Sequence, residues 1–368
     1  MILITGGAGF IGSHLADLLI EKGYRVRILD NLHPQVHSGF PSYLNKEVEF
    51  IKGDVRERGI LEKAIEGVEG IFHFAARVGV GQSMYEVKDY VEVNVGGTAS
   101  LLDILVNKKH KVKKLIVASS MSIYGEGAYN CKNCGTVYPR ERKGEDLKRR
   151  IWEPRCPHCG EETSPLPTSE EKPLYPSSIY AQTKREQEEM CLLIGKTYGI
   201  PTVALRFFNV FGSRQALSNP YTGVVAIFAS RILNGKPPVI YEDGQQLRDF
   251  IHVKDIARAS LLALEREEAD YEVFNVGTGR PVQIKEISRI LQKLLDKETG
   301  EEVTFRYRKG DIRTCYADVT KIKKKLGFEP EYSLEEGMKE LVPWLIGQKP
   351  KDEVDKVIGE MEERRLME

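Results

Sequence analysis

The fold is decided by the stretch Thr5-Gly6-Gly7-Ala8-Gly9-Phe10-Ile11-Gly12. It directly follows the aliphatic run Met1–Ile4 and leads into an amphipathic stretch, Phe10–Lys22. A strand, a glycine turn and a helix in this order are typical of a βαβ unit whose helix N-terminus faces a phosphate group. The first glycine permits the tight turn, the third lets the backbone approach a pyrophosphate, and the last lets helix and strand pack closely. The candidate dinucleotide-binding residues here are Gly6, Gly9, Phe10, Ile11 and Gly12.

Outward from this motif, short aliphatic runs alternate with amphipathic stretches. Predicted strands are Met1–Thr5, Tyr24–Leu29, Val48–Ile51, Gly70–Phe74, Val112–Ala118 and Thr202–Phe207. Predicted helices include Phe10–Lys22, Tyr85–Lys108 and Ile179–Tyr198. Such alternation predicts an α/β fold, a Rossmann-type doubly wound parallel sheet with helices on both faces.

The domain organisation follows from where this alternation of strands and helices changes. We expect an NAD-binding Rossmann domain over 1–211, interrupted by a polar, cysteine-bearing insertion at 127–163. Beyond it the helices expected at 221–234, 284–296 and 333–345 and the strands at 239–241 and near 303–307 suggest a smaller substrate-binding lobe, formed by 212–247 and 280–348. Residues 248–279 are expected to return to the Rossmann sheet. The charged stretch 349–368 is interpreted as a solvated C-terminal helix.

Composition limits the class of protein. The 54 Lys and Arg residues balance 54 Asp and Glu residues, which argues against wholesale binding to nucleic acid or an acidic membrane. The longest apolar runs, such as Leu101–Val106, fall far short of a membrane span, and Met1–Ile4 lacks the basic segment of a signal peptide. A cytoplasmic protein without a nucleic-acid or membrane partner is the prediction.

Further residues at the ends of strands fit a dinucleotide. Asp30 ends the second strand, where its carboxylate would accept hydrogen bonds from ribose hydroxyls and repel a 2′-phosphate, which favours NAD over NADP. Asp54 follows the third strand and is placed to meet the adenine. Small residues after the fourth strand leave room for a cofactor, although plain packing explains them equally well. The residues predicted to bind the cofactor on these grounds are Asp30, Asn31, Asp54, Val55, Phe74, Ala75 and Ala76.

A candidate catalytic group lies further along. Tyr180 and Lys184 share one face of a predicted helix, so the ammonium is expected to lower the pKa of the phenol. A phenol made acidic in this way accepts a proton from a substrate hydroxyl while hydride leaves for a nicotinamide. The run Ser119–Gly125 follows the fifth strand and places hydroxyls at the edge of the sheet where such folds bind ligands. Ser120, Tyr180 and Lys184 are the predicted catalytic residues.

These motifs occur in an order that resembles a known family. The glycine loop, Ser119–Gly125, Tyr180/Lys184, Arg206–Gly212, Arg248–Val253 and Asn275–Gly279 together resemble the extended short-chain dehydrogenase/reductases, and among them the NAD-dependent nucleotide-sugar epimerases and dehydratases. The resemblance covers roughly residues 1–345 apart from the insertion. It implies tightly bound NAD, a nucleoside diphosphate sugar as substrate, and a homodimer formed through the helices 85–108 and 179–198.

The resemblance also assigns roles by position. Asn94 and Ser119 match residues on the cofactor side, as do Tyr180 and Lys184. Asn209, Arg248, Arg308 and Asp311 match residues that hold the sugar diphosphate; an ordinary surface salt bridge is the alternative for Arg248. Residues 224–228 and Tyr241 would line the nucleoside pocket. The predicted substrate-binding residues are Ser120, Ser122, Tyr180, Asn209, Val224, Tyr241, Arg248, Arg308 and Asp311.

The type of reaction depends on two positions. Dehydratases of this family carry an acidic pair directly after the catalytic hydroxyl, whereas this chain has Met121 and Ser122, so a 4-epimerase of UDP-glucose-like type is expected. Cys315 either limits the sugar pocket or is a simple buried thiol. The insertion and the run 215–223 are similar to dTDP-L-rhamnose 4-epimerases, and a UDP-glucose/UDP-galactose or N-acetyl substrate stays equally open. The alternatives are a nucleotide-sugar oxidoreductase or decarboxylase and a non-catalytic NAD-binding regulator.

Four of the six cysteines form two Cys-x-x-Cys pairs, Cys131/Cys134 and Cys156/Cys159, each followed by glycine. Two such knuckles predict a closed tetrahedral Zn²⁺ site, a zinc ribbon, with a redox role or metal-free thiols as alternatives. Four protein ligands leave no open position, so a structural zinc is expected. Because the pairs interrupt the chain between Ser120 and Tyr180, the insertion is expected to shape either the sugar pocket or a subunit contact.

Overall fold

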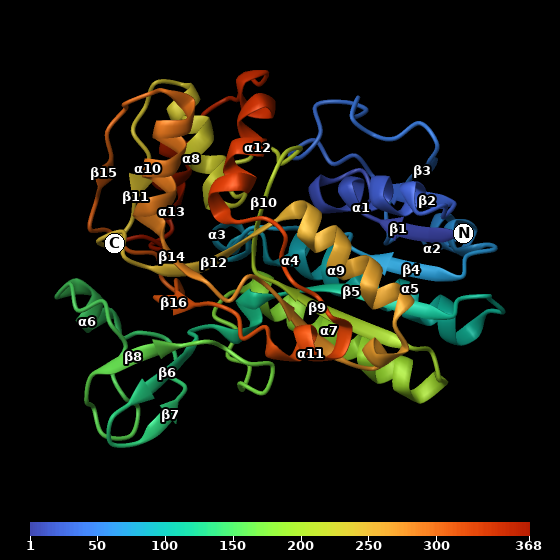
Figure 1. The fold of residues 1–368 in the computed structure, drawn as a ribbon, viewed down its shortest axis with the longest axis horizontal. Coiled ribbons are helices and arrows are strands. Elements are labelled where there is room, and N and C mark those ends of the chain that lie inside the picture. Colours follow the sequence, from blue (N-terminus) through green and yellow to red (C-terminus); the bar gives the residue numbers. More distant parts are fainter.

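The computed structural model describes residues 1–368 and is built around a seven-stranded sheet. The strands are β1 (Ile2–Thr5), β2 (Val26–Asp30), β3 (Glu49–Lys52), β4 (Gly70–His73), β5 (Lys114–Ser120), β9 (Thr202–Phe207) and β13 (Val273–Val276). They run parallel in the order β13-β9-β5-β4-β1-β2-β3 (Figure 1). The order reverses between β1 and β4, which is where doubly wound sheets bind ligands. The predicted fold class is confirmed.

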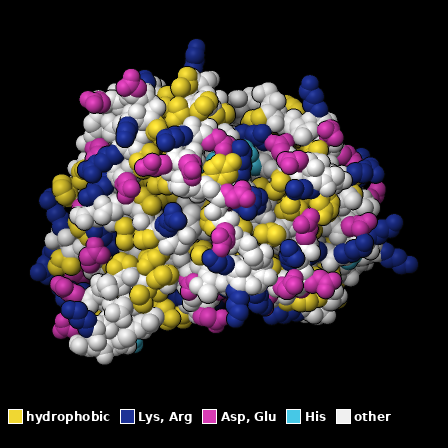
Figure 2. Space-filling view, viewed as in Figure 1, with side chains coloured by type: hydrophobic (Ala, Val, Ile, Leu, Met, Phe, Trp, Pro, Cys, Tyr) yellow, Lys and Arg dark blue, Asp and Glu magenta, His cyan; other side chains and the backbone are white.

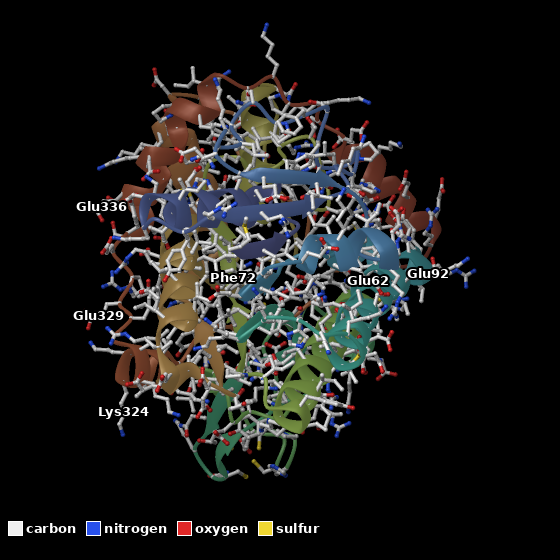
Figure 3. The ribbon with its side chains drawn as sticks, turned by 90° about the vertical axis from the view of Figure 1, so that its right-hand side faces the viewer. Glu62, Phe72, Glu92, Lys324, Glu329 and Glu336 are labelled. Carbon is white, nitrogen blue, oxygen red and sulfur yellow. The ribbon has the colours of Figure 1, made fainter.

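Helices cover both faces of this sheet. On one face lie α1 (Phe10–Glu21), α9 (Val253–Glu265) and α11 (Thr320–Leu326), whose apolar sides enter the largest core cluster. On the other lie α2 (Arg58–Ile65), α5 (Gly97–Asn107) and α7 (Ile179–Tyr198). Figure 3 shows Phe72 of β4 near the middle of the molecule, with Lys324, Glu329 and Glu336 at its edge. Burial on both faces explains why the central strands β1 and β4 read as short, mostly apolar runs.

The helix predicted over 85–108 has an irregular middle. It is divided into α4 (Val87–Tyr90), a π-helical segment η1 (Val91–Gly96) and α5. The wider π turn packs against α7 and holds Val93 and Asn94 in the interior. Such turns mark places where a helix accommodates a local requirement at the expense of regular geometry.

The smaller lobe carries three helices: α8 (Val224–Leu233), α10 (Ile284–Leu295) and α12 (Leu334–Ile346). Its strands are β10 (Asn209–Phe211), β12 (Leu247–His252), β14 (Pro281–Gln283) and β16 (Thr314–Cys315) in one sheet, and β11 (Val239–Ile240) with β15 (Glu302–Val303) in another. Within residues 248–279, only β13 joins the Rossmann sheet. The expectation that this whole stretch returns there is corrected for β12, because β12 pairs with β10, which has already left that sheet.

The insertion is a small unit of its own. β6 (Ala128–Cys131), β7 (Gly135–Val137) and β8 (Thr163–Leu166) form an antiparallel sheet in the order β7-β6-β8, and α6 (Gly144–Lys148) lies between β7 and β8. In Figure 1 this unit projects from the body at the lower left.

The chain ends in α13 (Val354–Glu363), and its surroundings differ from the expected solvated helix. Val354, Val357 and Met361 are buried, because one face of the helix packs on the rest of the protein while the charged residues face outward.

Three short segments complete the fold. They are the helix α3 (Val80–Ser83) and the two 3-10 turns η2 (Met121–Tyr124) and η3 (Glu267–Ala269).

The surface is of mixed charge. Figure 2 shows Lys and Arg side chains intermixed with Asp and Glu on the face in view. No helix has both the length and the apolar character needed to cross a membrane.

Candidate active site

A cavity of about 650 Å³ lies at the carboxyl edge of the parallel strands, between the large sheet and the smaller lobe. Loops after several strands converge there, as expected at the reversal of strand order. With one exception, Asn94, all predicted cofactor- and substrate-binding residues line it. They are Gly6, Gly9, Phe10, Ile11, Gly12, Asp30, Asn31, Asp54, Val55, Phe74, Ala75, Ala76, Ser119, Ser120, Ser122, Tyr180, Lys184, Asn209, Val224, Tyr241, Arg248, Arg308 and Asp311.

The glycine loop fits a dinucleotide. Gly6 has φ +70°, and a Cβ atom there would stand 2.8 Å from the backbone of Ala75. A Cβ atom on Gly12 would stand 2.6 Å from the carbonyl oxygen of Gly6. The loop is therefore held so close to its neighbours that side chains are excluded, which leaves the backbone N–H groups at the start of α1 open toward the cavity.

Acidic residues hold the adjacent loops. The N–H of Ala8 donates to Asp30 Oδ2 at 3.1 Å, which ties the end of β2 to the glycine loop. Burial raises the pKa of Asp54, but hydrogen bonds from Arg56 and Asn31 outweigh this and bring it to about 2. Both carboxylates line the cavity and suit hydrogen bonds from ribose or adenine donors.

Asn94 has a different place from the one expected. It is fully buried, accepts a hydrogen bond from the N–H of Arg77 at 2.7 Å and donates to the carbonyl of Arg77 at 3.1 Å and to Thr183 Oγ1 at 2.9 Å. It does not line the cavity. Its amide instead fixes the loop after β4 against α7, so its influence on a cofactor acts through that loop.

Ser120 and Tyr180 both line the cavity, and their side chains are hydrogen-bonded to each other. Ser120 ends β5 and accepts hydrogen bonds from Ser122 N at 3.2 Å and Ser122 Oγ at 2.9 Å. Tyr180 stands at the start of α7, which Ser178 caps by accepting from the N–H of Ala181, and the N–H of Tyr180 donates to Ser83 Oγ at 2.9 Å. Burial raises the pKa of Tyr180, and its hydrogen bond with Ser120 acts in the opposite direction.

Lys184 lies on the same helix face but has other partners. Its Nζ donates to Gln187 Oε1 at 2.8 Å, and burial lowers the pKa of the amine to about 8. Gln187 in turn donates to Thr98 Oγ1 at 2.9 Å, next to the buried His73. The expected lowering of the Tyr180 pKa by Lys184 is not found, because burial is the larger influence on both groups and opposes charge on each.

Cationic and polar groups line the other half of the cavity. Arg248 donates to the carbonyl of Ile312 at 2.6 Å, and Arg308 donates to Asp311 Oδ2 at 2.9 and 3.0 Å. The guanidinium of Arg308 also lies over the ring of Tyr241, 5.2 Å from its centroid. Arg248 is therefore no surface salt bridge: its side chain is 11% exposed and anchored by backbone carbonyls. The buried Asn209 Oδ1 has no hydrogen-bond partner within the protein, which is typical of an atom that awaits a ligand.

Of the two alternatives for Cys315, a residue that limits the sugar pocket or a simple buried thiol, the structure shows the buried thiol. It packs with Met121, Tyr124 and Phe208 behind the cavity, hydrogen-bonds to Thr168 Oγ1 at 3.8 Å and is not among the lining residues.

Sequence reasoning missed one wall of the cavity. Val354, Val357 and Met361 of α13 line it. Their spacing of three and four residues is the pattern of an amphipathic helix face, and the many charges between them obscured it. Other lining residues without a sequence signal include His33, Gln35, Arg77 and Gln246.

The four paired cysteines are brought together in the insertion. The sulfur atoms of Cys131, Cys134, Cys156 and Cys159 all lie within 4.8 Å of one another, and none forms a disulfide. Four sulfurs bound tetrahedrally at about 2.3 Å from one zinc ion lie about 3.8 Å apart, so the donor set suits that ion. Gly135 and Gly160 both have positive φ, +73° and +77°, as the predicted turns require.

Comparison with known proteins agrees with this geometry. Residues 2–142 and 157–277 match the model of the "NAD dependent epimerase/dehydratase family". The dTDP-L-rhamnose 4-epimerase of Burkholderia thailandensis is 34% identical over 352 residues, which is 94% of each chain. The UDP-glucose 4-epimerase of Thermotoga maritima, solved with UDP-glucose, is 34% identical with a TM-score of 0.76 and covers 94% of this chain and 98% of its own. The UDP-glucose 4-epimerase of Thermus thermophilus, solved with NAD, is 30% identical with a TM-score of 0.75 and covers 95% of this chain and 99% of its own. The chain therefore belongs to the NAD-dependent epimerase/dehydratase family.

Proposed function

We propose that the protein is an NAD-dependent epimerase that inverts C4 of a nucleoside diphosphate sugar through a transient 4-keto intermediate. The observation that carries the proposal is a single cavity with three parts: the glycine loop and Asp30, the Ser120–Tyr180 pair, and the cationic half with Arg248 and Arg308. A diphosphate suits two guanidinium groups, and the sugar it carries then reaches the hydroxyl pair.

Tyr180 is the proton acceptor for the C4 hydroxyl in this mechanism, and Ser120 orients that hydroxyl by hydrogen bonding. When bound, NAD would supply the hydride acceptor. The hydrogen bond from Ser120 acts against the burial that raises the pKa of Tyr180. After the keto sugar turns over, Tyr180 returns the proton, so the protein ends each turnover in its starting protonation state.

Dehydration does not fit the same site. It needs an acid and a base beside the catalytic hydroxyl, and Met121 and Ser122 occupy those positions. Ser122 already donates its hydroxyl to Ser120. The lining carboxylates are Asp30, Asp54, Asp89 and Asp311, which belong to the cofactor loops, to an ion pair with Arg77, and to the Arg308 pair.

Product analysis tests the proposal. Purified protein is incubated separately with dTDP-L-rhamnose, UDP-galactose and UDP-N-acetylglucosamine, and products are separated by anion-exchange chromatography. Conversion of one substrate to its C4 epimer, without added NAD and without net NADH, is expected and would identify both nucleotide and sugar. Stoichiometric NADH formation would instead indicate an oxidoreductase, and no conversion by protein that retains NAD would refute the epimerase.

We also propose that the four cysteines bind one structural Zn²⁺. All four ligand positions are then filled by protein, so the ion stabilises the insertion and takes no part in the reaction. A closed ribbon of this size has a core of only four residues, Tyr129, Cys131, Val137 and Cys156, which favours stabilisation by metal.

A homodimer through η1, α5 and α7 is the expected assembly. Supporting it, Met84, Val87 and Val91 are 38–42% exposed on one segment, and Leu193 and Tyr198 are 66% and 52% exposed on α7. Apolar side chains gathered on adjoining helices favour contact with a second copy. Light scattering of the wild type and of a Val87→Glu/Val91→Glu variant tests this; a wild-type monomer would refute it.

A further inference from the structure

The C-terminal helix α13 is a wall of the cavity. Val354, Val357 and Met361 are 8%, 5% and 3% exposed and stand on one face of the helix. Tyr221 and Tyr241, both lining residues, pack against that face. The apolar face of α13 therefore has the cavity as one of its neighbours, and the opposite face carries the charges that made the segment look fully solvated.

The helix also bridges the two lobes. Glu360 Oε2 accepts hydrogen bonds from Tyr221 Oη at 3.2 Å and Tyr85 Oη at 3.4 Å, and the guanidinium of Arg364 lies 4.5 Å from the centre of the Tyr85 ring. Tyr85 belongs to the chain after β4 in the large domain, whereas Tyr221 precedes α8 in the smaller lobe. Met361 Cε would stand 3.1 Å from a Cβ atom on Gly81, in α3.

The two flanks of α13 are tied to the smaller lobe. Lys236 forms ion pairs of 3.0 Å with Asp352, just before the helix, and with Asp355, in its first turn. After it, the last residues pair with the segment that holds Arg308: Lys309 N donates to Leu366 O at 2.9 Å, and Tyr307 N donates to Glu368 O at 2.9 Å. The anchors leave the apolar face of α13 directed at the substrate half of the cavity.

We propose that Val354, Val357 and Met361 are substrate-binding residues that enclose the nucleoside diphosphate sugar, an inference that rests on the proposed function. With the diphosphate at Arg248 and Arg308 and the sugar at Tyr180, the nucleoside occupies the remaining end, whose walls are apolar.

Val354, Val357 and Tyr241 all line the cavity, and Tyr241 packs against the face of α13 that bears Val357. An aromatic base placed there buries apolar surface against them. Met361 lies nearer the sugar, because Gly81 is two residues from Ser83, the acceptor for Tyr180 N–H. The wall thereby also hinders escape of the uncharged keto sugar ring while it turns over.

The test measures binding of dTDP and of UDP to the NAD-loaded protein by calorimetry. Val357→Asp places a charge in the apolar wall and is expected to weaken binding by about tenfold or more. Lys356→Gln changes the net charge by the same amount on the exposed face of the helix and should bind as the wild type does. NAD content should be equal in all three proteins, since α13 lines the substrate half of the cavity.

A chain that ends at Gln348 provides a second variant without α13. It should lose nucleotide affinity, keep NAD and, during turnover, accumulate enzyme-bound NADH as keto sugar escapes. If Val357→Asp and the shortened chain both bind the nucleotides as tightly as the wild type, α13 is no part of the binding site. Wild-type protein that binds neither nucleotide would overturn the proposed function and this inference with it.

Discussion

Arg142, in the cysteine-bearing insertion, forms a buried ion pair with Glu242, in the loop after β11. Its Nη2 lies 2.6 Å from Glu242 Oε1 and its Nη1 lies 3.0 Å from Oε2, and the two side chains are only 4% and 1% exposed. The same guanidinium donates to the backbone carbonyl of Asp311 at 3.0 Å. The insertion is thereby joined to the segment that carries Arg308 and Asp311, which we propose to hold the diphosphate.

Arg142→Leu is expected to destabilise the protein and weaken substrate binding. Removing one member of a buried pair leaves the other charge poorly solvated and costs about 3 kcal/mol of unfolding free energy. Arg313 lies 3.2 Å from Glu242 and will compensate in part. Denaturant unfolding and the KM for the nucleotide sugar are the measurements, with the exposed Arg149→Leu as control. Equal stability and KM in both variants would contradict the coupling.

Metal removal should act on the same segment. The protein is expected to contain one zinc per chain, and Cys156→Ser should lose it because three thiolates no longer close the site. We expect this variant to retain NAD but to show a raised KM, since the insertion then no longer holds the loop at Asp311. Metal content by elemental analysis, bound NAD and steady-state kinetics are the readouts. Full activity with an unchanged KM in the zinc-free variant would show that the ribbon serves something other than the substrate site.

Most of the sheet and the glycine loop could be predicted because their signals are local. Gly6 and Gly12 stand at fixed offsets from β1, and most of the strands contain a short apolar run bounded by polar or turn residues. The role of Asn94 could not be predicted from the sequence. Its partners Arg77 and Thr183 are brought to it by the tertiary fold and by a π turn that no residue pattern predicts.

The chemistry of the centre was only partly accessible for a similar reason. A spacing of four residues places Tyr180 and Lys184 on one helix face, but it carries no information on burial. Burial raises the pKa of Tyr180 and lowers that of Lys184, whose amine donates to Gln187. The inner face of α13 was predictable in principle, since Val354, Val357 and Met361 have helical spacing, and was overlooked because the segment is rich in charge.

Tyr180→Phe tests the assignment of the proton acceptor. Removing a positioned general base typically costs 10²–10⁴-fold in rate, so kcat should fall by about three orders of magnitude. The phenyl ring keeps the edge-to-face contact with Tyr90, whose ring centre is 6.5 Å away, so folding and NAD content should be unchanged. Binding of dTDP or UDP should change less than about threefold, because the diphosphate contacts lie elsewhere. A variant that retains more than a tenth of wild-type kcat would exclude Tyr180 as the base.

His73 predicts how stability depends on pH. Its ring is fully buried between Thr5 Oγ1 and Thr98 Oγ1, each 2.9 Å away, and burial, helped by the Lys184 charge, lowers its pKa to about 3 from 6.5. The unfolded chain therefore binds a proton that the folded protein does not between these values, so this contribution to stability is complete above about pH 6.5 and is lost as the pH falls toward 3. Each pH unit in that window costs up to about 1.4 kcal/mol.

His73→Asn keeps hydrogen-bonding atoms but does not titrate. At pH 7 the variant should be less stable than the wild type, because the smaller amide cannot satisfy both threonines. Between pH 6.5 and 4 the unfolding free energy of the wild type should fall more steeply, so that the two curves converge or cross. Denaturant unfolding across this range measures both slopes. Parallel curves would mean that His73 is protonated equally in the folded and unfolded chain, and acid sensitivity would then have to come from another buried group such as His14, whose pKa burial lowers to about 4.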